Sequence, residues 1–201
     1  MSVSTVPARP TTLGEAIVPR LAPAWRAVVL VSAGVALTAL AAQVRFTVPG
    51  TPVPFTGQTA AVLLTGAALG SRLGGVSLLL YVALGAIGLP IFNGGRSGIE
   101  QVLGITGGYL IGFVVAAAAV GWLAERGWDR TLPQAAMLMV LGNLVIYLIG
   151  VPVLAASAPM PLTDAVDRGA LAFIPGDALK IALAAGLLPL AWRLVGSRQA
   201  R

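Results

Sequence analysis

The sequence contains no cysteine and no histidine among its 201 residues. Their absence excludes disulfide bonds, thiolate chemistry and the commonest side-chain ligands of transition metals. It also removes the residue that enzymes most often use as a general base. We therefore predict neither a catalytic site nor a metal site, and we do not expect an enzyme.

Charged residues are also scarce, because Lys, Arg, Asp and Glu together make up 10% of the chain. Hydrophobic residues make up 57%, and the mean hydropathy is +0.91. A soluble domain is about 25% charged, so this composition indicates an integral membrane protein whose surroundings are a lipid bilayer. A net charge of +6 is also found in nucleic-acid-binding proteins, but here the arginines are scattered along the chain. We attribute them to membrane topology and expect no nucleic-acid partner.

Six apolar runs are candidates for membrane-spanning helices, each of which needs about 20 residues. They cover residues 27–44, 59–70, 74–91, 101–124, 134–157 and 176–195. Proline-rich and glycine-rich segments separate them, and proline breaks a helix interior. Residues 1–20 lack the apolar core of a secretory signal. We predict an all-α domain of six transmembrane helices over residues 26–196, a polar N-terminal tail over 1–25 and a C-terminal tail over 197–201.

The arginines also predict the orientation, because cytoplasmic loops are enriched in positive charge. With the N-terminus inside, nine arginines fall on the inner side and three, Arg45, Arg96 and Arg168, on the outer side. Both termini are therefore expected in the cytoplasm. The outer side then receives the long connections 45–58, 91–100 and 158–175, and long ordered loops usually carry function.

One lysine stands among twelve arginines, and it lies within an apolar run. This residue is Lys180, and Asp177 precedes it by three positions, so a helix places both side chains on one face. Charged residues in membrane segments are costly and are functional candidates by default. Two plainer readings compete with a ligand role. Asp177 can cap the helix N-terminus, and Lys180 can extend to the membrane interface.

Glycines are concentrated between residues 94 and 112, after Asn93. The segment 93–98 cannot form a stable regular helix, and Thr106, Gly107, Gly108 and Tyr109 are expected to open or interrupt the fourth span. Close packing of helices explains Gly104 and Gly112 about as well as a ligand does, since small residues dominate membrane helix interfaces. Residues 95–98 match the G-x-S-G motif of rhomboid-type proteases, but a serine without an activating base is a poor nucleophile.

Four motifs in order resemble the BioY family of biotin-binding S components from energy-coupling factor (ECF) vitamin transporters. They are VPFTGQT at 53–59, GLPIFNGG at 88–95, TGGYL at 106–110 and PGDALK at 175–180. The resemblance covers residues 27–195, with departures at Gly57, where the family often has leucine, and at Ile105, where it often has proline. It implies a six-helix protein of the bacterial cytoplasmic membrane without ATPase activity. The partners it implies are a transmembrane coupling protein and two ATP-binding cassette ATPases.

The resemblance also implies a biotin site in these outward-facing motifs. A biotin site needs hydrogen-bonding groups for the ureido ring, an apolar slot and a cation for the carboxylate. We predict Lys180 for the carboxylate and Asn93 for the ureido ring, with Asp177 either touching the ligand or orienting the lysine. The full set of expected substrate-binding residues is Gln58, Phe92, Asn93, Arg96, Thr106, Gly107, Gly108, Tyr109, Asp177 and Lys180.

Other functions remain as alternatives at this stage. An S component for another small vitamin has the same architecture. An intramembrane enzyme lacks support without His, Cys or paired carboxylates, and a purely structural protein does not explain Asp177 and Lys180. Asn143 is expected to bond between helices. The first helix carries small residues at Ser32 and Ala36 and at Gly34, Thr38 and Ala42, which serve either packing within the protein or, as the resemblance implies, docking of the coupling protein.

Overall fold

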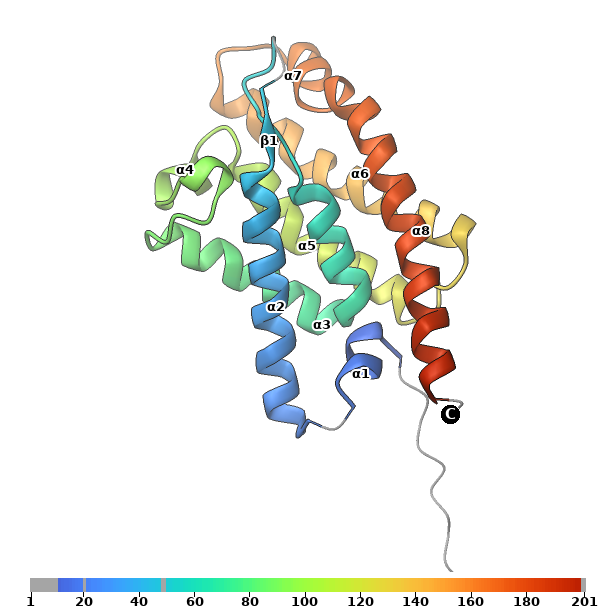
Figure 1. Cartoon of the computed structure of the whole chain (residues 1–201). Coiled ribbons are helices and arrows are strands. Elements are labelled where there is room, and N and C mark those ends of the chain that lie inside the picture. The colour runs from blue at the N-terminus through green and yellow to red at the C-terminus, as the bar shows by residue number, and fades with distance from the viewer. Residues whose placement is uncertain (1–10, 20, 48–49, 200–201) are drawn as a thin grey trace, which may run out of the picture.

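The structure is a computed structural model and describes residues 11–19, 21–47 and 50–199. The parts of the expected tails at 1–10 and 200–201 lie outside this range. Helices dominate, and one short antiparallel hairpin pairs Arg45 with Thr56 (Figure 1). The elements are α1 (Leu13–Ile17), α2 (Pro23–Gln43), β1 (Arg45–Phe46), β2 (Phe55–Thr56), α3 (Gln58–Ala86), η1 (Asn93–Gly95), α4 (Ile99–Leu103), α5 (Gly107–Ala124), α6 (Leu132–Ser157), α7 (Leu162–Gly169), η2 (Leu171–Phe173) and α8 (Ile174–Gln199).

The described residues contain five helical segments long and apolar enough to cross a membrane, where the sequence predicted six. The difference lies in α3, which contains the predicted run 59–70 and residues 74–86 of the predicted run 74–91. The predicted run 101–124 is also divided, because its first residues form α4 and only Gly107 opens the long helix α5. The remaining runs are found with ends shifted by a few residues.

Helix α3 folds back on itself at Gly70, which has φ 82° and ψ 176°. Such a positive φ strains any residue with a side chain but not glycine. A Cβ placed on Gly74 would lie 2.9 Å from the Cα of Gly66, so the arms on either side of Gly70 lie against each other. The carboxylate of Glu125 accepts a 2.8 Å hydrogen bond from the Ser71 N–H and so caps the second arm. The two runs of the sequence are therefore two arms of one bent element.

The long connections gather at one end of the molecule. The hairpin, α4 and α7 lie at that end, whereas α1 and the last turns of α8 lie at the other (Figure 1). The connections that the sequence predicted on the outer side therefore share one end of the molecule. The predicted N-terminal tail differs, since residues 13–17 form α1 with Leu13 buried against α3, and α2 already begins at Pro23.

Helix α5 forms the centre of the bundle and packs against α3 and α6. It approaches α3 closely at Gly66, where an added Cβ would overlap the carbonyl oxygen of Ala117 and lie 2.8 Å from its Cα.

Asn143 on α6 was expected to form a hydrogen bond to another helix, and that prediction is wrong. Its Nδ2 donates to the Met139 carbonyl oxygen of the same helix at 3.2 Å, and its Oδ1 has no partner among the described residues.

The contact at Gly66 predicts a stability effect. Gly66→Ala forces α3 and α5 apart, and overpacking of this kind costs about 1–3 kcal/mol. We therefore expect a lower melting temperature for the purified protein in detergent. Gly186→Ala is the matched control, because an added Cβ on this α8 glycine meets nothing within 4 Å. Alanine is the better helix former, so Gly186→Ala should leave the melting temperature unchanged or raised. Equal effects of both changes would contradict the close contact.

The two sets of small residues on α2 lie on different faces of the helix. Gly34, Thr38 and Ala42 are buried, and a Cβ on Gly34 would lie 2.7 Å from the Thr65 side chain of α3. This set serves packing within the protein. Ser32 and Ala36 are exposed on another face.

Candidate functional site

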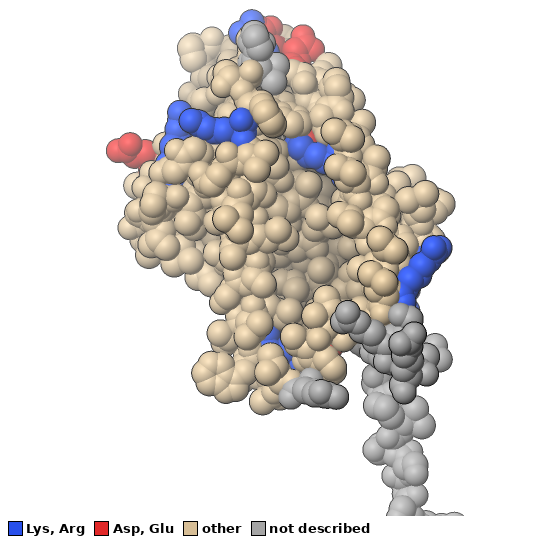
Figure 2. All heavy atoms as spheres, viewed as in Figure 1, with Lys and Arg blue, Asp and Glu red and all other residues tan. Residues whose placement is uncertain are grey.

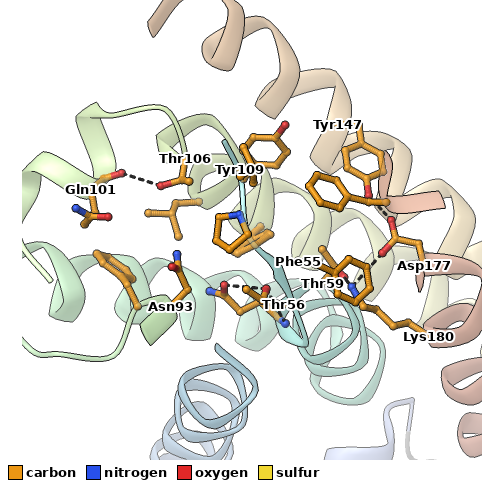
Figure 3. Close-up of a pocket in the computed structure, with 17 residues that line it drawn as sticks. Phe55, Thr56, Thr59, Asn93, Gln101, Thr106, Tyr109, Tyr147, Asp177 and Lys180 are labelled. Atoms are coloured by element: carbon orange, nitrogen blue, oxygen red, sulfur yellow. Dashed lines mark hydrogen bonds and ion pairs between the residues drawn. The ribbon is translucent and has the colours of Figure 1, made fainter. Parts of the chain in front are cut away.

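A pocket opens among the elements at the hairpin end of the molecule (Figure 3). The hairpin, the first turn of α3, the loop before η1, the start of α5, the middle of α6, η2 and the first turns of α8 each contribute to its lining. Seven of the ten predicted ligand residues line it. They are Gln58, Phe92, Asn93, Thr106, Tyr109, Asp177 and Lys180.

Lys180 and Asp177 form a partly buried ion pair at one side of the pocket. The Lys180 Nζ lies 3.1 Å from Asp177 Oδ1, and the two side chains are 15% and 7% exposed. The same ammonium donates a 2.9 Å hydrogen bond to Thr59 Oγ1 and lies 3.8 Å from the centre of the Phe55 ring. The Lys180 ammonium is therefore directed to groups that line the pocket. Two of its three N–H donors are engaged, and one is left for a ligand.

Asp177 is held from both sides. Its Oδ1 accepts from Lys180, and its Oδ2 accepts a short hydrogen bond from the Tyr147 hydroxyl of α6. Both carboxylate oxygens are thus bound to side chains of the pocket. Asp177 lies in the first turn of α8, but these side-chain bonds, rather than capping alone, account for its position.

Asn93 presents an unpaired acceptor to the pocket. Its side chain is buried, and Oδ1 has no hydrogen-bond partner among the described residues. A loop held by Gln43 of α2 carries it. Gln43 Nε2 donates to the Phe92 carbonyl oxygen at 3.3 Å, and Gln43 Oε1 accepts from the Gly95 N–H at 3.1 Å. Buried polar atoms are nearly always hydrogen-bonded, so Asn93 Oδ1 is suited to a donor on a ligand.

Aromatic rings form the walls. Phe92 is 1% exposed and packs edge-on against Tyr81, with ring centres 5.5 Å apart. The Tyr109 ring stands edge-on to Tyr147 at 6.5 Å, and its hydroxyl donates to the Gly169 carbonyl oxygen at 2.8 Å. Phe55 of the hairpin and Phe173 of η2 meet at 6.0 Å. The pocket is therefore mainly apolar between Asn93 and Lys180.

Gln58 lines the pocket, but its amide is already bonded within the protein. Its Nε2 donates to the Tyr81 hydroxyl at 2.9 Å, and its Oε1 accepts from Thr56 Oγ1 at 3.1 Å. Gln58 was expected to bind substrate, but these bonds give its amide a structural role within the protein. Thr106 lies near Gln101, whose carbonyl oxygen is 3.5 Å from Thr106 Oγ1.

Three predicted ligand residues do not line the pocket. A Cβ on Gly107 would overlap the Val102 carbonyl oxygen, and one on Gly108 would lie 2.9 Å from the Ile149 carbonyl oxygen of α6. These glycines are needed for a tight turn and for helix packing rather than for contact with a ligand. Arg96 is exposed and is not among the residues that line the pocket.

Sequence reasoning missed several lining residues, namely Phe55, Thr59, Gln101, Tyr147 and Phe173. Phe55 and Thr59 belong to a motif noted in the sequence, but no charge or unusual spacing marked them individually. Tyr147 lies within an apolar run and looks like an ordinary core aromatic. It is 30 positions from Asp177, so only the packing of α6 against α8 brings the two together.

Comparisons with known proteins agree on one family. The model of the BioY family matches residues 12–197. The biotin transporter BioY of Rhizobium etli is 38% identical over 141 residues, which cover 67% of this chain and 75% of that protein. The probable biotin transporter BioY of Pyrococcus horikoshii is 42% identical over 155 residues, covering 77% and 89%.

A solved structure shares the fold. It is the crystal structure of the S-component for biotin from an ECF-type ABC transporter, with a TM-score of 0.77 and 22% identity. The match covers 86% of this chain and 95% of that one. The chain therefore has the fold of an ECF S component.

Proposed function

The chain belongs to the BioY family, and we propose from this and from the pocket that it is the biotin-binding S component of an ECF-type vitamin transporter. It captures biotin and performs no reaction on it, in keeping with a family of transporter components. The observation that carries the assignment of substrate to site is that one apolar pocket holds both a partly buried ammonium, on Lys180, and an acceptor, Asn93 Oδ1, that has no partner among the described residues.

Biotin offers N–H donors only on its ureido ring, and its other polar end is a carboxylate. Asn93 Oδ1 needs a donor, which assigns the ureido ring to Asn93. Lys180 has a donor to spare and a positive charge, which assigns the carboxylate to Lys180. The bicyclic ring and the valeryl chain then lie between the aromatic walls of Phe92, Tyr109 and Phe55.

Asp177 holds the lysine rather than the ligand in this proposal. Its two oxygens are used by Lys180 and Tyr147. A carboxylate placed next to the carboxylate of biotin would also repel it. The ion pair keeps the ammonium charged in a poorly solvated place, because a nearby opposite charge favours the charged form.

Calorimetric titration of the purified protein in detergent tests the substrate. We expect saturable heat with biotin at one site per chain and a raised melting temperature, since a ligand that binds only the folded state stabilises it. A response to a different vitamin and none to biotin would move the assignment to that vitamin. No response to any vitamin would reject the function.

We further propose that the domain crosses the bacterial cytoplasmic membrane six times with both termini in the cytoplasm. The bend of α3 at Gly70 supplies two crossings from one element. Figure 2 shows a broad uncharged band across the middle of this face, with charged side chains toward its two ends. Such a band is expected where the surface meets lipid.

The orientation is tested by cysteine labelling, for which a chain without native cysteine has no background. Ser97→Cys, at the hairpin end, should react with a membrane-impermeant maleimide in intact cells. Arg72→Cys is the matched inner position, exposed beside the bend of α3, and should react only after permeabilisation. The opposite pattern would reverse the topology.

For partners we propose a transmembrane coupling protein and two ATP-binding cassette ATPases, with α2 as the docking helix. The exposed small residues Ser32 and Ala36 support this, because small residues allow close approach of another helix. Ala36→Trp should abolish co-purification with the coupling protein while leaving biotin binding unchanged. Co-purification that survives this change would place the docking surface elsewhere.

A further inference from the structure

Helix α8 carries both charged residues of the site. The centre of its buried face consists of Ala184 and Ala185, with Leu188 buried beside them and Ile181, Trp192 and Val195 partly buried against the core. Its large exposed side chains, Leu179, Leu183, Leu187 and Leu190, point outward. The two alanines offer no large knob to interlock with a neighbour, and small residues define the rotation of a helix weakly. Specific polar bonds must therefore contribute to the orientation of α8.

Two of these bonds lie at the pocket end and have been described, from Tyr147 to Asp177 and from Lys180 to Thr59. The third lies at the opposite end of α8. There Trp192 Nε1 donates a 2.5 Å hydrogen bond to Oδ2 of Asp129, in the loop between α5 and α6. The Arg130 guanidinium covers the Trp192 ring at 4.4 Å.

Asp129 is an unusual residue for a short loop. It is completely buried, and its Oδ1 has no partner among the described residues. Burial raises the pKa of this carboxyl, while the bond from Trp192 opposes the rise. Burying a carboxylate that is only half satisfied costs free energy, so a loop that merely connected two helices would gain nothing from aspartate here.

The hydrogen bond between Trp192 and Asp129, called the anchor below, is linked to the site by the spacing of residues along α8. Asp177, Ala184, Leu188 and Trp192 follow one another at intervals of seven, four and four residues, so they share one face of the helix. Trp192 lies twelve residues beyond Lys180, or about 18 Å along the axis at 1.5 Å per residue. Pro189 lies between them and removes a backbone hydrogen bond, so the inner segment of α8 needs a constraint of its own.

We propose that Asp129 is a positioning residue for the biotin site: through Trp192 it fixes the inner end of α8, and thereby the rotation that points Asp177 and Lys180 into the pocket. The inference rests on the proposed function for its link to biotin. The anchoring of α8 itself does not depend on that function.

Two conservative variants test the anchor. Asp129→Asn removes the charge, and Trp192→Phe removes the N–H donor together with part of the indole while keeping an aromatic ring beneath Arg130. Trp122→Phe is the matched control, because Trp122 carries a similar arginine, Arg126, at 3.5 Å from its ring centre but lies on α5 and is half exposed.

The first measurement is affinity for biotin and for biotinamide, which lacks the negative charge. In each of the two anchor variants we expect biotin to bind about three- to tenfold more weakly, the range that positions remote from a ligand produce. Biotinamide should change less, so the preference for biotin falls. Trp122→Phe should keep the preference of the unmodified protein.

The second measurement is independent of biotin. Spin labels on cysteines at Leu190 of α8 and Leu144 of α6, both exposed, report the distance between the helices by pulsed electron resonance. We expect a broader distance distribution when Asp129→Asn or Trp192→Phe is added, and no change with Trp122→Phe. An unchanged distribution together with an unchanged preference for biotin would overturn the proposal, even if the melting temperature fell, because the bond would then hold only the loop. If the unmodified protein failed to bind biotin, the proposed function would fail, and the distance measurement would still decide the anchor.

Discussion

Lys180→Met lowers the affinity for biotin by about 100-fold or more, whereas the affinity for biotinamide falls by less than about fivefold. The expectation follows from the environment of the ammonium, which lies 3.1 Å from Asp177 and is only 15% exposed. Truncating one partner of a buried hydrogen-bonded charge pair costs about 2–5 kcal/mol. Biotin carries a negative charge that pairs with this ammonium, and biotinamide does not. The loss of affinity should therefore be much larger for biotin than for biotinamide. Calorimetric titration of both ligands measures it.

A second variant separates ligand recognition from damage to the site. Lys180→Met leaves the Asp177 carboxylate without its cation, and an unpaired buried charge is destabilising in itself. The double variant Asp177→Asn with Lys180→Met removes both charges and should recover melting temperature without recovering biotin affinity. If biotin and biotinamide lost affinity equally in these variants, Lys180 would not bind the carboxylate. If Asp177→Asn alone weakened biotinamide as strongly as Lys180→Met weakens biotin, Asp177 would be a direct ligand residue.

The helices and the gathering of the long connections at one end of the molecule could be predicted from the sequence because both depend on local composition. Runs of apolar residues are long, and proline and glycine mark their ends. The separation of long outer from short inner connections followed from the same pattern, and Figure 1 shows those connections at one end of the molecule. The irregular backbone at residues 93–98 was also foreseen from its glycines, and the structure has only a short 3-10 turn there.

The bend of α3 could be placed only approximately. The predicted runs 59–70 and 74–91 placed the break between them, at 71–73, but the backbone reverses at Gly70, where Glu125 at the end of α5 supplies the cap for Ser71. The position of the turn thus depends on a hydrogen bond between Ser71 and Glu125, which are 54 residues apart in the sequence. Helix α1 was missed for a similar reason, since its five residues are stabilised by burial of Leu13 against distant helices.

The site was predicted where a residue was chemically unusual and missed where it was ordinary. Lys180, Asp177 and Asn93 are polar residues within or beside apolar runs, and the structure brings all three to one pocket. Tyr147 looks like an ordinary core aromatic and Thr59 is one unmarked residue of a longer motif, although both bond directly to the ion pair. Gly107 and Gly108 were assigned to the ligand because glycine permits close approach, but the groups that approach them are Val102 and Ile149 of the protein itself. A glycine in the sequence indicates that another group lies close to the backbone, but only the tertiary structure identifies that group.

Asn93→Leu tests the other end of the ligand, and we expect it to weaken biotin by about 10- to 100-fold. Leucine has a similar volume but offers no acceptor, so a ureido N–H would enter the pocket unpaired, at a cost of about 1–3 kcal/mol. Asn143→Leu is the matched control. Asn143 is equally buried, at 7% against 8% exposure, and also has an unpaired Oδ1, but it does not line the pocket. Its replacement should leave biotin affinity unchanged.

A modified ligand makes the assignment specific to the ureido ring. Biotin methylated on the ureido nitrogen that faces Asn93 lacks the donor, so the unmodified protein should bind it far more weakly than biotin. Asn93→Leu should discriminate little between the two, because the acceptor that distinguishes them has gone. Full discrimination retained in Asn93→Leu would mean that another group receives the ureido N–H. If that group were Asp177, both of whose oxygens are already bonded, the ion pair would have to rearrange when biotin binds, and the orientation of biotin in the pocket would be reversed.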